Sequence, residues 1–145
     1  MRREVAEWLQ GQHNGVRERK LCIVDGFLLF GESVKSVREC FDVRLLLRAT
    51  YAKAKQRREA RSGYATIEGF WEDPPGYVEK IVWPSYVEEH AFMFRDGDVE
   101  GEVDEATTAR LGVEVVPGNG NLNIEEMVKW AISKVKTALQ ASGSI

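Results

Sequence analysis

The most constraining feature of the sequence is an apolar run, Leu21–Val24, that ends abruptly at Asp25 and Gly26. A run without polar alternation is typical of a central strand in a parallel sheet, where both faces are covered. In open α/β sheets, ligands bind beyond the carboxyl ends of the strands. Asp25 is therefore either a magnesium-linked carboxylate of a nucleotide site or a strand terminator, because Asp-Gly is also common turn chemistry.

Strands and helices alternate along the rest of the chain, which predicts an α/β fold with a parallel sheet. Asn123 and Glu126 form a capping box that begins a C-terminal helix, and the apolar stripe of this helix is expected to pack in the core. The sequence further predicts strands over 20–25, 43–47 and 112–116, helices over 2–10, 34–41, 51–61 and around 84–94, a loop over 11–15, and an acidic surface loop over 95–105.

Length and composition exclude several classes of protein. The 145 residues fit one domain, and the net charge of −3 gives no general attraction to nucleic acid or anionic membranes. No apolar run approaches the roughly 20 residues that span a bilayer, and the N-terminal residues lack a signal-peptide core. Cys22 and Cys40 make no metal-binding spacing with the two histidines, and Cys22 is expected to be buried as a small hydrophobe. We therefore expect a reducing, cytoplasmic location, with the nucleus as a second compartment.

A cationic patch is predicted on the helix over 51–61. Arg57 and Arg61 are four residues apart and share a helix face, whereas Arg58 points about a hundred degrees away. Like charges at this spacing mildly destabilise a helix, so the patch favours an anionic partner, and the planar fork of arginine suits phosphate oxygens. The alternative is a solvated helix face that Glu59 partly neutralises. Nucleic acid is a weaker candidate, because the patch is short and the remaining surface repels phosphate.

A long segment rich in glycine, proline and aromatic residues follows the patch, over 63–76. Loops of this length inside a compact domain are usually lids, binding loops or disordered segments. The order of elements along this chain is a strand that ends in aspartate, a second strand, an arginine helix and a lid. The second half of a nucleotide-phosphate kinase has the same order. In phosphoryl transfer, a well-placed arginine contributes about three to five powers of ten in rate.

Three segments carry a resemblance to a known family: LCIVDGFLLF (21–30), TYAKAKQRREAR (50–61) and DPPGYVEKIVWPSYVEEH (73–90). They resemble the nicotinamide riboside kinases, in the uridine-kinase-like group of P-loop kinases, most of all the fungal members with their longer lid. The resemblance implies a partial P-loop NTPase (Rossmann-like) three-layer α/β fold with a parallel sheet, truncated at its N-terminus. By this resemblance, the chain forms one partial kinase domain with five parts. They are a helix and a loop (1–19), two core strands and their connection (20–50), the arginine helix and the lid (51–86), a helix and the acidic loop (87–111), and the last strand with the C-terminal helix (112–145).

The resemblance also implies a reaction and a set of site residues. The reaction transfers the γ-phosphate of ATP to nicotinamide riboside, giving nicotinamide mononucleotide, with Mg²⁺. Asp25 matches an acidic group near the magnesium shell and would act through water, and Arg57 and Arg61 match lid arginines that contact ATP. Arg58 matches an arginine that contacts the nucleoside. Tyr64 matches an aromatic that stacks on the nicotinamide ring, where a cation–π contact contributes roughly 0.5–2 kcal/mol, or it only packs within the lid.

The family's phosphate loop has no counterpart in this sequence. No Gly-Lys dipeptide occurs in the 145 residues, so no lysine of a G-x-x-x-x-G-K-[ST] motif reaches the phosphates. The family's catalytic base also has no counterpart, so we assign no catalytic residue. We expect the chain to be the C-terminal part of a longer kinase and to be inactive alone. The alternatives are a related nucleoside kinase acting on uridine, and a non-catalytic module that binds a nucleotide or a partner.

Overall fold

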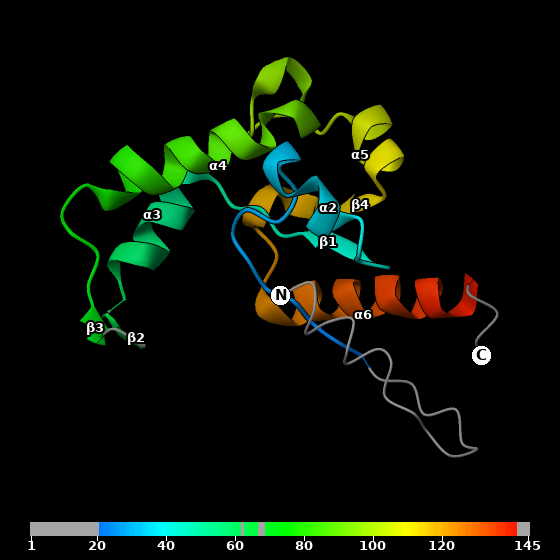
Figure 1. The fold of residues 1–145 in the computed structure, drawn as a ribbon, viewed down its shortest axis with the longest axis horizontal. Helices are drawn as coiled ribbons and strands as arrows, with labels where there is room; N and C mark the ends of the chain where they lie inside the picture. Colours follow the sequence, from blue (N-terminus) through cyan, green and yellow to red (C-terminus); the bar gives the residue numbers. More distant parts are fainter. Residues whose placement is uncertain (1–20, 62, 67–68, 142–145) are drawn as a thin grey trace.

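The computed structural model describes residues 21–61, 63–66 and 69–141, and the predicted helix over 2–10 and loop over 11–15 lie outside them. The described residues form a mixed α/β structure (Figure 1). The elements are η1 (Glu32–Val34), α2 (Lys35–Arg38), β1 (Arg44–Leu46), α3 (Tyr51–Glu59), β2 (Tyr64–Thr66), β3 (Gly69–Trp71), the π-helical η2 (Val78–Val82), α4 (Trp83–His90), η3 (Ala91–Met93), η4 (Arg95–Gly97), α5 (Glu105–Leu111), β4 (Val113–Val115), η5 (Pro117–Gly120) and α6 (Ile124–Ala141).

The two predicted strands β1 and β4 pair in parallel, which confirms the α/β class with a parallel sheet. Leu46 lies opposite Val115, and the buried face of the pair carries Leu46 and Val113. Glu114 points to the opposite face, where its carboxylate lies 2.9 Å from the Nζ of Lys134 in α6. The sheet therefore separates α6 from the helices on the other face (Figure 1).

The core lies on the face of the sheet opposite α6. Met93, in η3 directly after α4, is fully buried there. The buried apolar residues of this cluster are Phe30, Leu46, Tyr86, Met93, Phe94, Val99 and Val113. The cluster therefore brings together segments that lie far apart in the sequence, from Phe30 to Val113.

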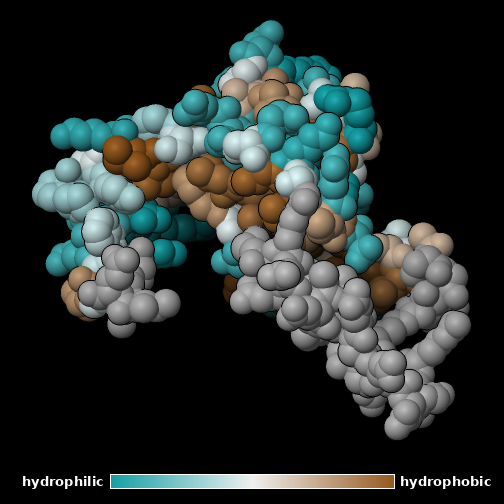
Figure 2. Space-filling view, viewed as in Figure 1, coloured by the Kyte–Doolittle hydropathy of each residue, from teal (hydrophilic) through white to brown (hydrophobic). Residues whose placement is uncertain are grey.

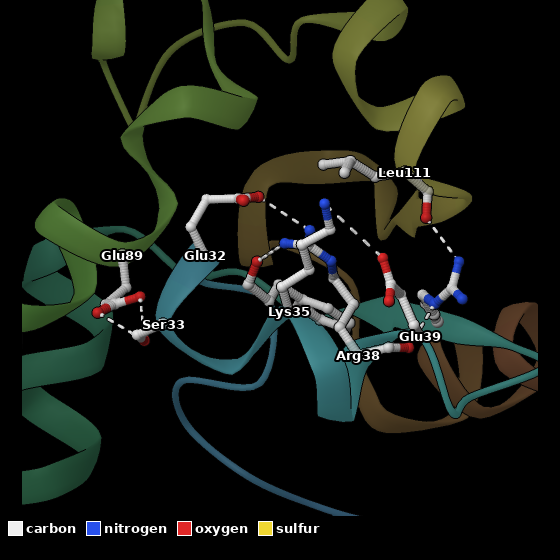
Figure 3. Close-up of polar contacts among 9 residues, drawn as sticks. Glu32, Ser33, Lys35, Arg38, Glu39, Glu89 and Leu111 are labelled. Atoms are coloured by element: carbon white, nitrogen blue, oxygen red, sulfur yellow. Dashed lines mark hydrogen bonds and ion pairs between the residues drawn. The ribbon is translucent and has the colours of Figure 1, made fainter.

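A buried arginine, Arg38, fastens the segment before β1 to the core (Figure 3). Its Nη1 donates to the carbonyl of Phe30 at 2.5 Å, and its Nη2 donates to a carboxylate oxygen of Glu32 at 2.8 Å. Ser33 donates to the carboxylate of Glu89 in α4, at 3.2 Å for the shorter contact. These bonds satisfy a buried charge and hold η1 against α4, and Arg44 Nε in β1 donates to the Arg38 carbonyl at 2.9 Å, which ties α2 to β1.

The prediction of a buried first strand is wrong. Residues 21–26 have no regular secondary structure and pair with no strand in the described part of the chain. Leu21 and Ile23 are 66% and 82% exposed, and Cys22 is exposed rather than buried. A parallel strand is stable only when a neighbour takes its backbone hydrogen bonds, and β1 pairs only with β4 among the described strands.

The prediction that the stripe of α6 packs in the core is also wrong. The capping box itself is confirmed: Glu126 donates its N–H to Asn123 Oδ1 at 3.0 Å, and Asn123 donates its N–H to the Glu126 carboxylate at 2.9 Å. However, no described residue of α6 is buried, and Ile124, Val128 and Ile132 are exposed. Figure 2 shows that apolar side chains also gather across the middle of the viewed face.

Two other segments contain more structure than the sequence predicts. The long segment over 63–76 contains an antiparallel hairpin, in which β2 pairs with β3 and Tyr64 lies opposite Trp71. The acidic stretch over 95–105 exposes most of its carboxylates, but Val99 within it is buried. Its last part begins α5, because Asp104 accepts hydrogen bonds from the N–H groups of Ala106 and Thr107 as an N-cap.

No described helix is both long enough and apolar enough to cross a membrane.

Candidate functional site

The arginines of interest lie at the C-terminal end of α3. The helix begins at its N-cap Thr50, whose side chain accepts from the N–H of Lys53 at 3.4 Å, and it ends at Glu59. Arg61 therefore lies beyond the helix, and the prediction that it shares a helix face with Arg57 is wrong. The helix ends two residues earlier than predicted: Ala60 still bonds to the carbonyl four residues before it, whereas Arg61 bonds to the carbonyl only three residues before it, which tightens the last turn.

Contacts with η2 and α4 fix the direction of α3. Lys55 donates to the carboxylate of Glu79 and also lies 3.7 Å from that of Glu59. The hydrogen bond from Lys55 lowers the pKa of Glu79, and the same bond raises the pKa of Lys55. The ring of Tyr51 meets Trp83 edge to face, with centroids 5.2 Å apart. The helix is thus held along one side against the segment that follows the hairpin.

A cleft of about 160 Å³ lies between the end of α3 and the residues after β3. Arg58, Glu59 and Arg61 line one side, and residues 72–78 line the other. Pockets for whole small-molecule ligands usually measure about 300–1,000 Å³, so this cleft has room for part of a nucleoside only. Arg57 is exposed and is not among the lining residues. The structure therefore brings together two of the three predicted arginines.

Arg58 is held by a carboxylate and an aromatic ring. Its Nε donates to Asp73 Oδ2 at 2.5 Å, and its Nη2 donates to Asp73 Oδ1 at 3.2 Å. Trp71 Nε1 donates to the same Oδ1 at 2.9 Å, and the guanidinium carbon lies 5.5 Å from the centre of the Tyr77 ring. The hydrogen bond from Arg58 is the main reason why the pKa of Asp73 is lowered, with smaller contributions from Trp71 and the charge of Arg61.

Neither Asp25 nor Tyr64 is among the described residues that line the cleft. Asp25 is exposed in the irregular segment after Val24, and it forms no hydrogen bond or ion pair with another described residue. Tyr64 is the first residue of β2, and its backbone lies opposite that of Trp71 in β3. Their roles stay predictions.

The described residues do not form a metal site by themselves. No group of three or more histidine, cysteine, aspartate or glutamate side chains comes together in the described ranges. Mg²⁺ is usually held by one or two carboxylates together with substrate phosphates. A lone, exposed Asp25 fits only an ion whose other ligands come from phosphate and water.

Asp73 is the residue of this site that sequence reasoning did not single out. It lies in the stretch DPPGY, which carries the family resemblance, but its partner Arg58 is 15 residues earlier. The signal was an acidic residue two positions after a tryptophan and directly before two prolines. Prolines stiffen the chain after Asp73, which favours a fixed position for the carboxylate.

Comparison with known proteins gives one consistent result. The chain is similar to the nicotinamide riboside kinase of Schizosaccharomyces pombe, with 39% identity over 123 residues, which are 85% of this chain and 50% of the relative. It is 44% identical over 97 residues to the protein of that name from Eremothecium gossypii, covering 67% of this chain and 39% of the relative. The corresponding Saccharomyces cerevisiae protein is 39% identical over 104 residues, covering 70% and 42%.

The chain thus spans half or less of the length of these curated relatives. No protein-family model matches the sequence, and no solved structure gives a significant match.

Proposed function

We propose that the chain supplies the lid and part of the nucleoside site of a nicotinamide riboside kinase, because it is homologous to these kinases over the residues it shares with them. The reaction is transfer of the γ-phosphate of ATP to nicotinamide riboside, which gives nicotinamide mononucleotide. The proposed fold is a three-layer P-loop NTPase fold, of which β1, β4 and their helices form a part.

The observation that carries this proposal is the identity of 39–44% to three proteins that bear this name. The cleft beside α3 supports it independently. Arg58 and Arg61 both line this cleft, although one lies on the helix and the other beyond it. Guanidinium groups beside a small cleft suit phosphate and ribose oxygens.

Each site residue then has a separate task. Arg57 and Arg61 contact ATP, and their positive charges offset the negative charge that the transferred phosphoryl group carries. Arg58 and Tyr64 bind the nucleoside, with Tyr64 under the nicotinamide ring. Asp25 would hold Mg²⁺ through water, and the ion would offset the negative charge of the ATP phosphates.

We propose that residues 1–145 alone do not transfer phosphate, because the sequence contains no Gly-Lys of a phosphate loop. The test compares the chain with a chimera in which it replaces the matched segment of the Schizosaccharomyces pombe relative. The chimera should phosphorylate nicotinamide riboside with ATP and magnesium, and the isolated chain should not. Robust turnover by the isolated chain would refute its inactivity, and an inactive but folded chimera would count against the kinase assignment.

A substrate panel on the same chimera separates the two nucleoside kinases. A preference for nicotinamide riboside over uridine is expected, because the family resemblance extends through the lid over 73–90. A preference for uridine would reassign the chain to the related class.

The lack of a phosphate loop also favours a second candidate, a non-catalytic module that binds nucleotide. Calorimetry on the isolated chain tests it with ATP as the probe. Measurable binding that is lost in the double variant Arg57→Ala and Arg61→Ala would support retained nucleotide recognition. Lys35→Ala together with Arg110→Ala, which remove two positive charges elsewhere, serve as the control.

A further inference from the structure

The ion pair between α3 and the segment after β3 has features of a built site. Both oxygens of Asp73 accept hydrogen bonds, two from Arg58 and one from Trp71. The Arg58 and Asp73 side chains are only 26% and 20% exposed. Exposed pairs with a single contact contribute little, whereas a two-point, partly buried arginine–carboxylate contact fixes orientation. Asp73 therefore determines where the guanidinium of Arg58 points.

Aromatic rings limit the remaining freedom of this pair. Arg58 lies over Tyr77, and the ring of Trp71 meets that of Tyr77 edge to face at 6.2 Å between centroids. Two segments, the end of α3 and the end of β3, thus meet at the Asp73 carboxylate, and the ring of Tyr77 packs beside the pair. Loss of the carboxylate alone should loosen both Arg58 and Trp71.

The pair also changes the charge that a ligand meets. An unpaired guanidinium attracts phosphate and repels a cation, whereas a guanidinium paired with a carboxylate carries no net charge. The nicotinamide ring of nicotinamide riboside is a pyridinium and therefore cationic. A nucleoside site that placed a bare arginine beside this ring would select against it.

We propose that Asp73 is a positioning and specificity-determining residue, which orients Arg58 and balances its charge so that the site accepts a cationic nucleoside. This inference rests on the proposed function for its ligand, but not for the orientation of Arg58. The carboxylates of Glu59 and Glu72 line the same cleft, and Arg61 is the other positive charge there. None of these replaces the two-point contact with Arg58.

The orientation is tested on the 145-residue chain without ligand. In nitrogen-15 NMR spectra, the Arg58 Nε–H and Trp71 Nε1–H signals should both shift in Asp73→Asn, and the Arg58 Nε–H should exchange with water several-fold faster. Asp73→Glu, which keeps the carboxylate, should restore much of the protection. The control is Glu88→Gln, which removes the same charge from an exposed site on α4. Unchanged signals in Asp73→Asn would overturn the proposed orientation.

The charge balance is tested by calorimetry with two probes of opposite charge. Asp73→Asn should weaken binding of nicotinamide riboside about tenfold and strengthen binding of inorganic pyrophosphate by a similar factor. A purely structural defect would weaken both, so equal losses would overturn the charge-balance proposal.

Failure of the unaltered chain to bind nicotinamide riboside would overturn the specificity claim alone, because the proposed function gives this chain only part of the nucleoside site and is tested by turnover of the chimera. The NMR result would still decide the orientation, so the two failures are distinguishable.

Discussion

Alanine substitutions at Ile23 and at Leu46 test whether residues 21–25 are exposed, as in the structure, or buried in a strand, as the sequence predicts. The sequence prediction places both residues in buried strands. The two substitutions remove the same number of carbon atoms. Leu46 is 5% exposed in the core, so Leu46→Ala should destabilise the fold by about 2–5 kcal/mol. Ile23 is 82% exposed. Full burial of an isoleucine contributes about 1.5–3 kcal/mol, and less than a fifth of this surface is covered, so Ile23→Ala should cost about 0.5 kcal/mol or less.

Urea-induced unfolding followed by far-ultraviolet circular dichroism measures both costs. Leu46→Met keeps the side-chain volume and should cost less than about 1.5 kcal/mol, which provides a measurable variant if Leu46→Ala does not fold. A cost for Ile23→Ala that equals that of Leu46→Ala would show that residues 21–25 form a packed strand after all. The structural account of this segment would then be wrong.

Three further predictions concern local structure. Asn123→Ala removes the acceptor for the Glu126 N–H and should destabilise α6 by about 0.5–2 kcal/mol, which thermal unfolding would reveal. Burial lowers the pKa of His90, although its hydrogen bond with the Tyr86 carbonyl opposes this effect. The folded state thus binds the proton less tightly than the unfolded state, so the stabilisation is complete above about pH 6.5 and decreases as the pH falls below it. Urea unfolding at pH 7.5 and 5.5 should show this loss, and His90→Gln should reduce it. Gly112 ends α5 at φ +62°, so Gly112→Ala should cost about 1 kcal/mol by the same unfolding assay.

Features that depend on neighbours in sequence could be predicted. The capping box at Asn123 uses atoms three residues apart, and β4 ends at Val115, close before Pro117, whose missing N–H cannot continue the ladder. The helix over 51–59 follows from its helix-forming residues and the cap at Thr50. In each case the residues that form the contact lie within one or two turns of chain.

Features that depend on a distant partner could not be predicted. The sequence assigns Arg58 to a ligand, whereas the structure also pairs it with Asp73, and no periodicity connects these two positions. Arg48 is buried because its Nη2 donates to the carbonyls of Val99 and Gly101, in a stretch that the sequence describes only as acidic. Such pairs need the path of the chain, which local patterns do not contain.

The error at Leu21–Val24 does not affect the position of the arginine cleft. Leu45 and Leu46 are as apolar as the residues of that run, but β4 lies beside them and takes their backbone hydrogen bonds. Strand formation therefore follows from the partner and not from composition. The cleft is positioned by β1, because Thr50 begins α3 four residues after Leu46 and α3 carries Arg58 to Asp73. The placement of Arg58 consequently depends on β1, α3 and the residues after β3. Any role of Asp25 depends instead on the segment 21–26, for which the described residues provide no strand partner.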